Sequence, residues 1–162
     1  MSKEQIVEIK FNEEPDIRIR VIQDNDTDAT KKSKIKYPFE LFCTVNVTIV
    51  TDFRTFSFDI YNGYTWNGSD IPQFLWSLVG SRTDTQFLTA ALLHDYILQF
   101  RKYMLKEVLH NEMTVDEYIR LTSLIFREQL KKSEVKTIKA NIMSWFVNTY
   151  QILFNRKQWK IS

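Results

Sequence analysis

The sequence predicts one α+β domain spanning residues 1–162: an antiparallel meander of about four strands, followed by three to four helices packed against it. Two patterns support this fold class. In residues 1–61 apolar and polar residues alternate, as in half-buried strands, whereas from residue 62 onward apolar residues recur with helical spacing. A length of 162 residues with 44% hydrophobic content suits a single domain with one sizeable core.

Four segments of the first half are predicted strands. Residues 6–11 and 17–21 alternate apolar and charged side chains, residues 39–51 are rich in Val, Ile, Thr and Phe, and residues 55–61 alternate again. The polar stretch 24–34 is expected to be an exposed loop. Strands that follow one another through short connections favour an antiparallel meander.

The second half opens with a turn-rich loop at 62–70, which contains two of the three glycines. A short helix is expected to begin near Ile71, with Pro72 tolerated in its first turn and Gly80 at its end. Three longer helices follow from apolar residues that recur on one face. They are expected at 85–106, from Thr114 or Asp116 to about Lys132, and from Ser133 onward.

Composition excludes several kinds of site. The single Cys43 rules out an internal disulfide and a cysteine-rich zinc site. The N-terminus lacks the apolar stretch of a signal peptide, and no window approaches the 18 or more apolar residues of a membrane span. Secretion by a signal peptide and a membrane partner are therefore not expected.

Charge is distributed unevenly along the chain. Residues 1–100 contain 10 Lys and Arg against 14 Asp and Glu, or −4, and residues 101–162 contain 12 against 6, or +6. A basic helical half suits nucleic acid or an acidic partner, or it is simply a set of solvated helix faces. Because the basic residues are spread along helices rather than clustered with aromatics, nucleic acid is not an expected partner.

His94 and Asp95 interrupt an otherwise apolar helical run. His94 shares a face with Ala91 and Leu98, so its side chain is expected to point into the core. Burying an ionisable pair is costly unless hydrogen bonds or a metal ion offset the lost solvation. The pair is thus either a satisfied structural network or a functional site.

The loop at 62–70 contains further side-chain oxygens. Turn and helix capping explains Asn67, Ser69 and Asp70 without any function. Alternatively the loop brings Asn67 and Asp70 beside the helical pair, forming a divalent-metal or acid/base site. A nucleophilic triad of Ser69, His94 and Asp95 is poorly supported, because adjacent helical residues point about 100° apart.

Residues 63–100 resemble the domain of unknown function 1353 family, small proteins frequent in bacteriophage and prophage genomes. The resemblance is carried by Asn-Gly-Ser-Asp-Ile-Pro at 67–72, by Phe-Leu-Trp at 74–76 with Gly80, and by Ala-Ala-Leu-Leu-His-Asp-Tyr at 90–96. Order and spacing agree over about 40 residues. The resemblance implies a phage-type setting, cytoplasmic in the host cell or virion-associated, and no established activity.

This chain departs from the family pattern at three positions. The family's loop Asp is Asn67 here, its loop Ser is Asp70, and its Asp on a later helix aligns with Ser123. If the family's acids were metal ligands, this chain would have lost two and gained one. The departures favour a structural role for the polar residues.

Two functions remain in competition. The first is a non-catalytic virion or host-interaction component, with other phage or host proteins as partners and a structural His-Asp network. The second is a metal-dependent hydrolase in which Asp70, His94 and Asp95 are metal ligands or acid/base groups, oriented by Asn67, Ser69 and Ser123. A divalent metal ion is the candidate cofactor of this second function.

Overall fold

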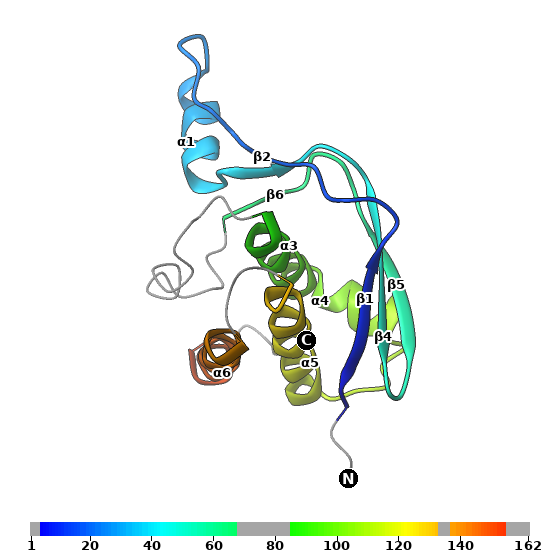
Figure 1. Cartoon of the computed structure of the whole chain (residues 1–162). Helices are drawn as coiled ribbons and strands as arrows, with labels where there is room; N and C mark the ends of the chain where they lie inside the picture. The colour runs from blue at the N-terminus through cyan, green and yellow to red at the C-terminus, as the bar shows by residue number, and fades with distance from the viewer. Residues whose placement is uncertain (1–3, 68–84, 133–136, 155–162) are drawn as a thin grey trace.

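The computed structural model describes residues 4–67, 85–132 and 137–154 and has the predicted α+β class. Two small antiparallel sheets are formed by the first part of the chain, and helices from the second part pack on them. Figure 1 shows the larger sheet on one side of the molecule, α3 and α5 in the middle, and α6 on the side away from the sheet. The helices are therefore layered outward from the sheet.

The larger sheet contains β1 (Ile6–Phe11), β4 (Val45–Thr51) and β5 (Thr55–Ile60), in the order β1-β4-β5. β4 and β5 form the predicted hairpin, with Val47 opposite Phe58. Side chains of β4 alternate strictly between buried and half-buried. The structure thus confirms a strand in both segments, and β4 buries the face on which Val45, Val47 and Ile49 lie.

The smaller sheet contains β2 (Ile17–Ile19), β3 (Phe39–Leu41) and β6 (Thr65–Trp66), in the order β2-β3-β6. The single strand expected at 39–51 is therefore wrong in one respect: its two halves belong to different sheets. Between them the Phe42 amide donates to the Asp16 carbonyl oxygen, and the Asp16 amide donates to Cys43 Sγ at 3.3 Å. These bonds anchor the bend at which the chain changes sheets.

The prediction of a loop at 24–34 is also wrong in part, because helix α1 (Asp28–Lys36) begins within this segment. The Thr27 hydroxyl oxygen caps the helix by accepting from the Thr30 amide. Lys34 bridges to Asp26 at 2.7 Å and to the Val21 carbonyl oxygen at 2.9 Å. Since α1 buries none of its side chains, it has no apolar stripe from which it could have been predicted.

The helical half follows the predicted boundaries closely. α3 covers Thr85–Gln99, and after a break at Phe100 the short α4 (Arg101–Tyr103) and a π-helical turn η1 (Met104–Val108) complete the expected 85–106 segment. α5 (Val115–Leu130) begins at a capping box formed by Thr114 and Glu117. α6 covers Thr137–Phe154. The short helix expected after Ile71 lies outside the described residues.

α5 is the central helix of the bundle. It packs against α3 on one side and α6 on the other, and it also contacts β1. Just beyond it, Lys132 Nζ donates to the carbonyl oxygen of Ile9 in β1 at 2.9 Å. Among the described residues, no helix is long and apolar enough to cross a membrane.

Candidate functional site

His94 and Asp95 lie in the interior, as predicted for His94. From Phe87 to Leu98 every residue of α3 is buried, because the helix is enclosed by its neighbours. The His94 and Asp95 side chains both have an exposed fraction of 0%. An ionisable pair in such surroundings has lost its hydration. The free-energy cost of burying it therefore depends on the contacts that it makes inside the protein.

The two side chains approach each other without forming a hydrogen bond. His94 Nδ1 lies 3.6 Å from Asp95 Oδ1, which is too long for such a bond. Neither ring nitrogen of His94 has a hydrogen-bond partner among the described residues. Instead the imidazole packs against the Phe126 ring of α5, with ring centroids 5.4 Å apart. His94 is therefore held by packing in the described part of the chain.

The spacing of the pair is compatible with a shared metal ion. Nitrogen and oxygen ligands bind a divalent ion such as zinc at about 2.0–2.2 Å, so two ligands of one ion lie at most about 4.4 Å apart. A Nδ1–Oδ1 separation of 3.6 Å falls inside that limit. Within residues 4–67, 85–132 and 137–154, however, no three His, Cys, Asp or Glu side chains gather to complete such a site.

The other predicted site residues are only partly placed. Ser69 and Asp70 lie outside the described residues, and Asn67 is half-buried just after β6. Ser123 donates its hydroxyl to the Ile119 carbonyl oxygen at 3.1 Å and lies 3.4 Å from Asn148 Oδ1 on α6. The structure thus brings His94 and Asp95 together on α3. The Ser123 hydroxyl is directed away from this pair, toward α6.

Two tyrosines fix α3 in position beside the pair. Tyr96 donates its hydroxyl to the Asp59 carbonyl oxygen of β5 at 2.8 Å, and burial raises its pKa to about 12. Tyr118 of α5 donates to the Ile97 carbonyl oxygen, and burial raises its pKa as well. These buried hydroxyls tie α3 to the sheet and to α5, which limits how far the helix can move.

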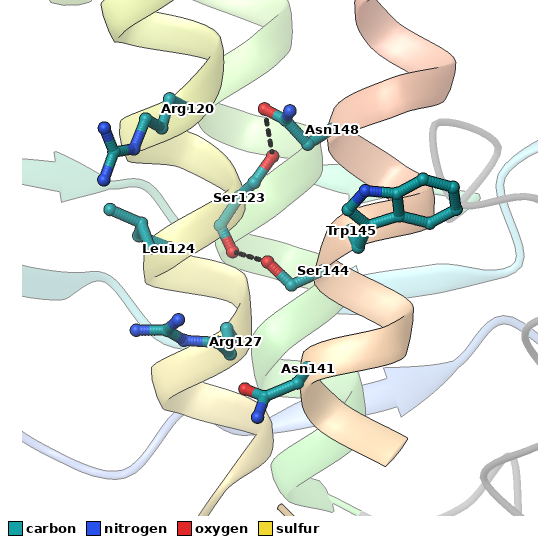
Figure 2. Close-up of a pocket in the computed structure, with 8 residues that line it drawn as sticks. All are labelled: Arg120, Ser123, Leu124, Arg127, Asn141, Ser144, Trp145 and Asn148. Carbon is teal, nitrogen blue, oxygen red and sulfur yellow. Dashed lines mark hydrogen bonds between the residues drawn. The ribbon is translucent and has the colours of Figure 1, made fainter. Parts of the chain in front are cut away.

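A second region, which sequence reasoning missed, lies between α5 and α6. It is an open groove of about 440 Å³, within the range of ligand-binding pockets. Among the residues that the structure describes, its lining contains two arginines, two serines, two asparagines, one leucine and one tryptophan, and no carboxylate. Figure 2 shows these side chains: Arg120, Ser123, Leu124, Arg127, Asn141, Ser144, Trp145 and Asn148.

The two arginines of this α5–α6 groove differ in their partners. Arg127 donates from Nε and Nη2 to Glu128 Oε1 at 3.1 and 2.9 Å, and Lys131 bonds the same oxygen. Arg120 has no ion pair among the described residues. One guanidinium is thus oriented by its neighbour while the other is free to meet an anion.

The floor of the groove is fixed by internal hydrogen bonds. The Ser144 hydroxyl donates to the carbonyl oxygen of Ser123 at 2.8 Å, and both serines are buried. Trp145 lines the groove from α6, is 62% exposed and meets the Phe146 ring edge-on. A spacing of seven residues, shared by the two arginines and by the two asparagines, places each pair on one face of its helix, but it does not indicate that the two faces meet.

Comparison with known proteins finds similarity but no described activity. The model of a family described as "Protein of unknown function (DUF1353)" matches residues 44–147. A relative called "Uncharacterized protein y4jT", from Sinorhizobium fredii (strain NBRC 101917 / NGR234), is 28% identical over 103 residues, which are 59% of this chain and 26% of that protein. The chain thus matches about a quarter of the relative's length. No solved structure matches.

Proposed function

This chain belongs to the DUF1353 family, and we propose that it is a non-catalytic interaction component, of a virion or directed at a host protein, that binds through the α5–α6 groove. The family resemblance implies the phage-type setting. In this proposal His94 and Asp95 are structural residues of the α3 core. The partner is another protein of the phage or the host.

The observation that carries the proposal is the difference in access between the two regions. His94 and Asp95 are fully enclosed, whereas the groove is open and Trp145 projects from its edge at 62% exposure. Tryptophan and arginine are the residue types most enriched where binding energy concentrates in protein interfaces. The groove combines Trp145 and two arginines around the hydrogen-bonded Ser123 and Ser144. This arrangement supports protein binding rather than bond cleavage.

A structural role for the pair is supported by its surroundings. The imidazole packs on Phe126, which is itself fully buried, and the flanking tyrosine hydroxyls tie α3 to β5 and α5. A helix enclosed in this way offers a substrate no path to its side chains. The pair therefore acts by filling and orienting the core.

A metal-dependent hydrolase is the second candidate, and one observation favours it. Both ring nitrogens of buried His94 make no hydrogen bond among the described residues, which costs about 1–3 kcal/mol for each group left unsatisfied. A metal ion bound to one nitrogen and to Asp95 would offset that cost. Asn67 and Asp70 would complete the site, and the ion would activate water.

A thermal unfolding series separates the two functions. Wild type, His94→Leu and the control Trp145→Ala are melted with and without zinc, manganese or magnesium. The interaction proposal expects the same melting temperature with and without metal in all three proteins. A rise in wild type and Trp145→Ala that is lost in His94→Leu would instead establish the metal site.

Photo-crosslinking tests the binding surface directly. A photoreactive amino acid replaces Trp145 in one variant and Ile35 in another, since Ile35 is 70% exposed on α1, far from the groove. In the cells that make the protein, position 145 is expected to capture one partner protein that position 35 does not. Equal capture from both positions, or none from position 145, would contradict the proposal.

A further inference from the structure

We propose that the α5–α6 groove binds an acidic amphipathic helix of a partner protein, one with two carboxylates seven residues apart and an apolar residue between them. This inference rests on the proposed function and names the chemistry of the partner. Four features of the groove lead to it: its charge, the spacing of its polar groups, its exposed tryptophan and the absence of a matching helix among the described residues of this chain.

The charge of the groove selects an anionic partner. Its described lining contains the guanidinium groups of Arg120 and Arg127 and no acidic side chain. Glu128, which neighbours Arg127, shares its Oε1 between that arginine and Lys131, so two cations offset its single charge. A carboxylate is the natural protein ligand of a guanidinium because the two groups match in geometry.

The polar groups of the groove form two ends, each with one arginine and one asparagine, and the arginine at the Arg127 end is bonded to Glu128. In Figure 2 Arg120 lies at the level of Asn148, and Arg127 lies at the level of Asn141. Both pairs of like residues are seven positions apart, or about 10.5 Å along a helix. The two serines between them are bonded to backbone carbonyls, so the donors for an anion are concentrated at the two ends.

This spacing favours a helix over an extended chain. The backbone positions of the two arginines are about 10.5 Å apart along α5, whereas side chains on one face of a strand repeat at about 6.6 and 13 Å. Residues seven apart on an α-helix share a face and repeat at about 10.5 Å. A partner helix that lies along the groove can therefore place one carboxylate at each end of the groove at the same time.

Trp145 determines which type of residue the partner helix needs between its two carboxylates. It comes from α6, between Asn141 and Asn148 in the chain, and is 62% exposed. A partner helix whose acids contact the two ends presents its third or fourth intervening residue to this indole. An apolar residue there would bury the tryptophan, as amphipathic helices do in other helical grooves.

A second copy of this chain is a poor fit for the groove. None of its described helices has two acidic residues seven positions apart: α3 contains Asp95 alone, and the acids of α5 are Asp116, Glu117 and Glu128. Because no described helix of a second copy matches the groove, we assign the partner helix to a different protein.

A peptide titration tests the inference. The probe is a fluorescent alanine-based helical peptide of about 20 residues, long enough to form a stable helix, with Glu at positions i and i+7 and Leu at i+4. The matched control peptide has Gln in place of both Glu residues. We expect the Glu peptide to bind wild type about tenfold more tightly than the Gln peptide, since two exposed ion pairs are lost.

Protein variants locate the binding. Arg120→Gln with Arg127→Gln is expected to weaken binding of the Glu peptide about tenfold, and Lys102→Gln, an exposed charge elsewhere, to change it less than about twofold. Arg120→Glu with Arg127→Glu should instead prefer a peptide with Lys at i and i+7. Circular dichroism confirms that each variant is folded.

Three results would overturn the inference. The Glu and Gln peptides could bind equally, a single-stranded oligonucleotide could compete through the same arginines, or sedimentation could show a dimer that both arginine substitutions dissociate. Crosslinking from position 145 distinguishes a failure of the acidic-helix inference from a failure of the proposed interaction function. If that position captures a partner while the peptide does not bind, only the acidic-helix inference fails.

Discussion

The His94–Asp95 pair and the α5–α6 groove both contain ionisable or polar side chains, but they lie in opposite environments. The pair interrupts an apolar run and is conspicuous in the sequence, yet the fold encloses it completely. The arginines and Trp145 lie on ordinary-looking helices, yet the fold leaves them facing an open groove. A conspicuous residue therefore indicates an unusual environment, whereas a binding surface depends on what remains uncovered.

The cause of this difference is the position of each helix in the layers. α3 is buried from Phe87 to Leu98, so its polar side chains are buried with it. α5 packs on α3, β1 and α6, and α6 has only α5 as its main neighbour among the described elements. One edge of the α5–α6 contact consequently stays open to solvent. The following predictions test this contrast, in order of expected size.

Removing the aromatic support of the pair should have the largest effect. Phe126→Ala deletes a fully buried ring in contact with His94, and it is expected to lower the free energy of unfolding by about 3–5 kcal/mol. Urea denaturation measures this loss. A loss below 1 kcal/mol, on the order of a surface substitution, would show that the core around His94 is loosely packed.

Two substitutions at His94 distinguish packing from polar bonding. His94→Ala leaves a cavity and should cost about 2–4 kcal/mol, whereas His94→Leu refills the space and should cost less than about 1.5 kcal/mol. The same urea titration compares both variants with wild type. If His94→Leu were as damaging as His94→Ala, polar contacts of the imidazole rather than its volume would be essential.

Tyr96→Phe should cost about 1 kcal/mol at neutral pH, because the hydrogen bond to the Asp59 carbonyl oxygen is lost. Burial raises the pKa of Tyr96 from 10.0 to about 12 in the folded state, so the unfolded chain ionises first. The stability due to the neutral phenol is present below pH 10 and is lost as pH rises through about 12.

The advantage of wild type over Tyr96→Phe should therefore shrink as pH rises from 10 to 12. Denaturation of both proteins at several pH values measures the difference, and Tyr61→Phe, an exposed position, is the matched control. An advantage that stays constant over this range would indicate that Tyr96 ionises equally in both states.

The groove should show the smallest effect on stability. Trp145→Ala and Arg120→Ala are each expected to change the free energy of unfolding by less than about 0.5 kcal/mol, since neither side chain is part of the core. Thermal denaturation of the two variants checks this. A loss comparable to that of Phe126→Ala would mean that the groove is a structural seam instead of a binding surface.

Most of the fold was predictable because its elements bury one face. The Val-, Ile- and Thr-rich composition of β4, the alternation in β5 and the apolar residues of α5 predicted these elements, and Thr114 was one of the two residues predicted to start α5. α1 was missed because it buries nothing and is held by a cap and by lysine bonds. The bend at 42–44 was missed because a local pattern does not specify which strand pairs with which.

The candidate site was predictable only in part. An inward-facing His94 followed from its helical face, and the structure confirms it. The Ser123 hydroxyl was expected to orient the pair, but its hydrogen bonds are with Ile119 and Asn148. Helical periodicity gives the face of a residue along one helix, but it does not give the neighbouring helix that covers that face.

The sequence by itself determined the α+β class, the main strands and helices and the burial of His94, because each depends on the periodic placement of apolar residues within one segment. The tertiary structure alone decided that residues 39–51 divide between two sheets and that Arg120, Arg127, Asn141 and Asn148 line one groove between α5 and α6. These features depend on contacts between segments far apart in the chain. Such contacts are selected by the packing of the whole molecule, which no local pattern records.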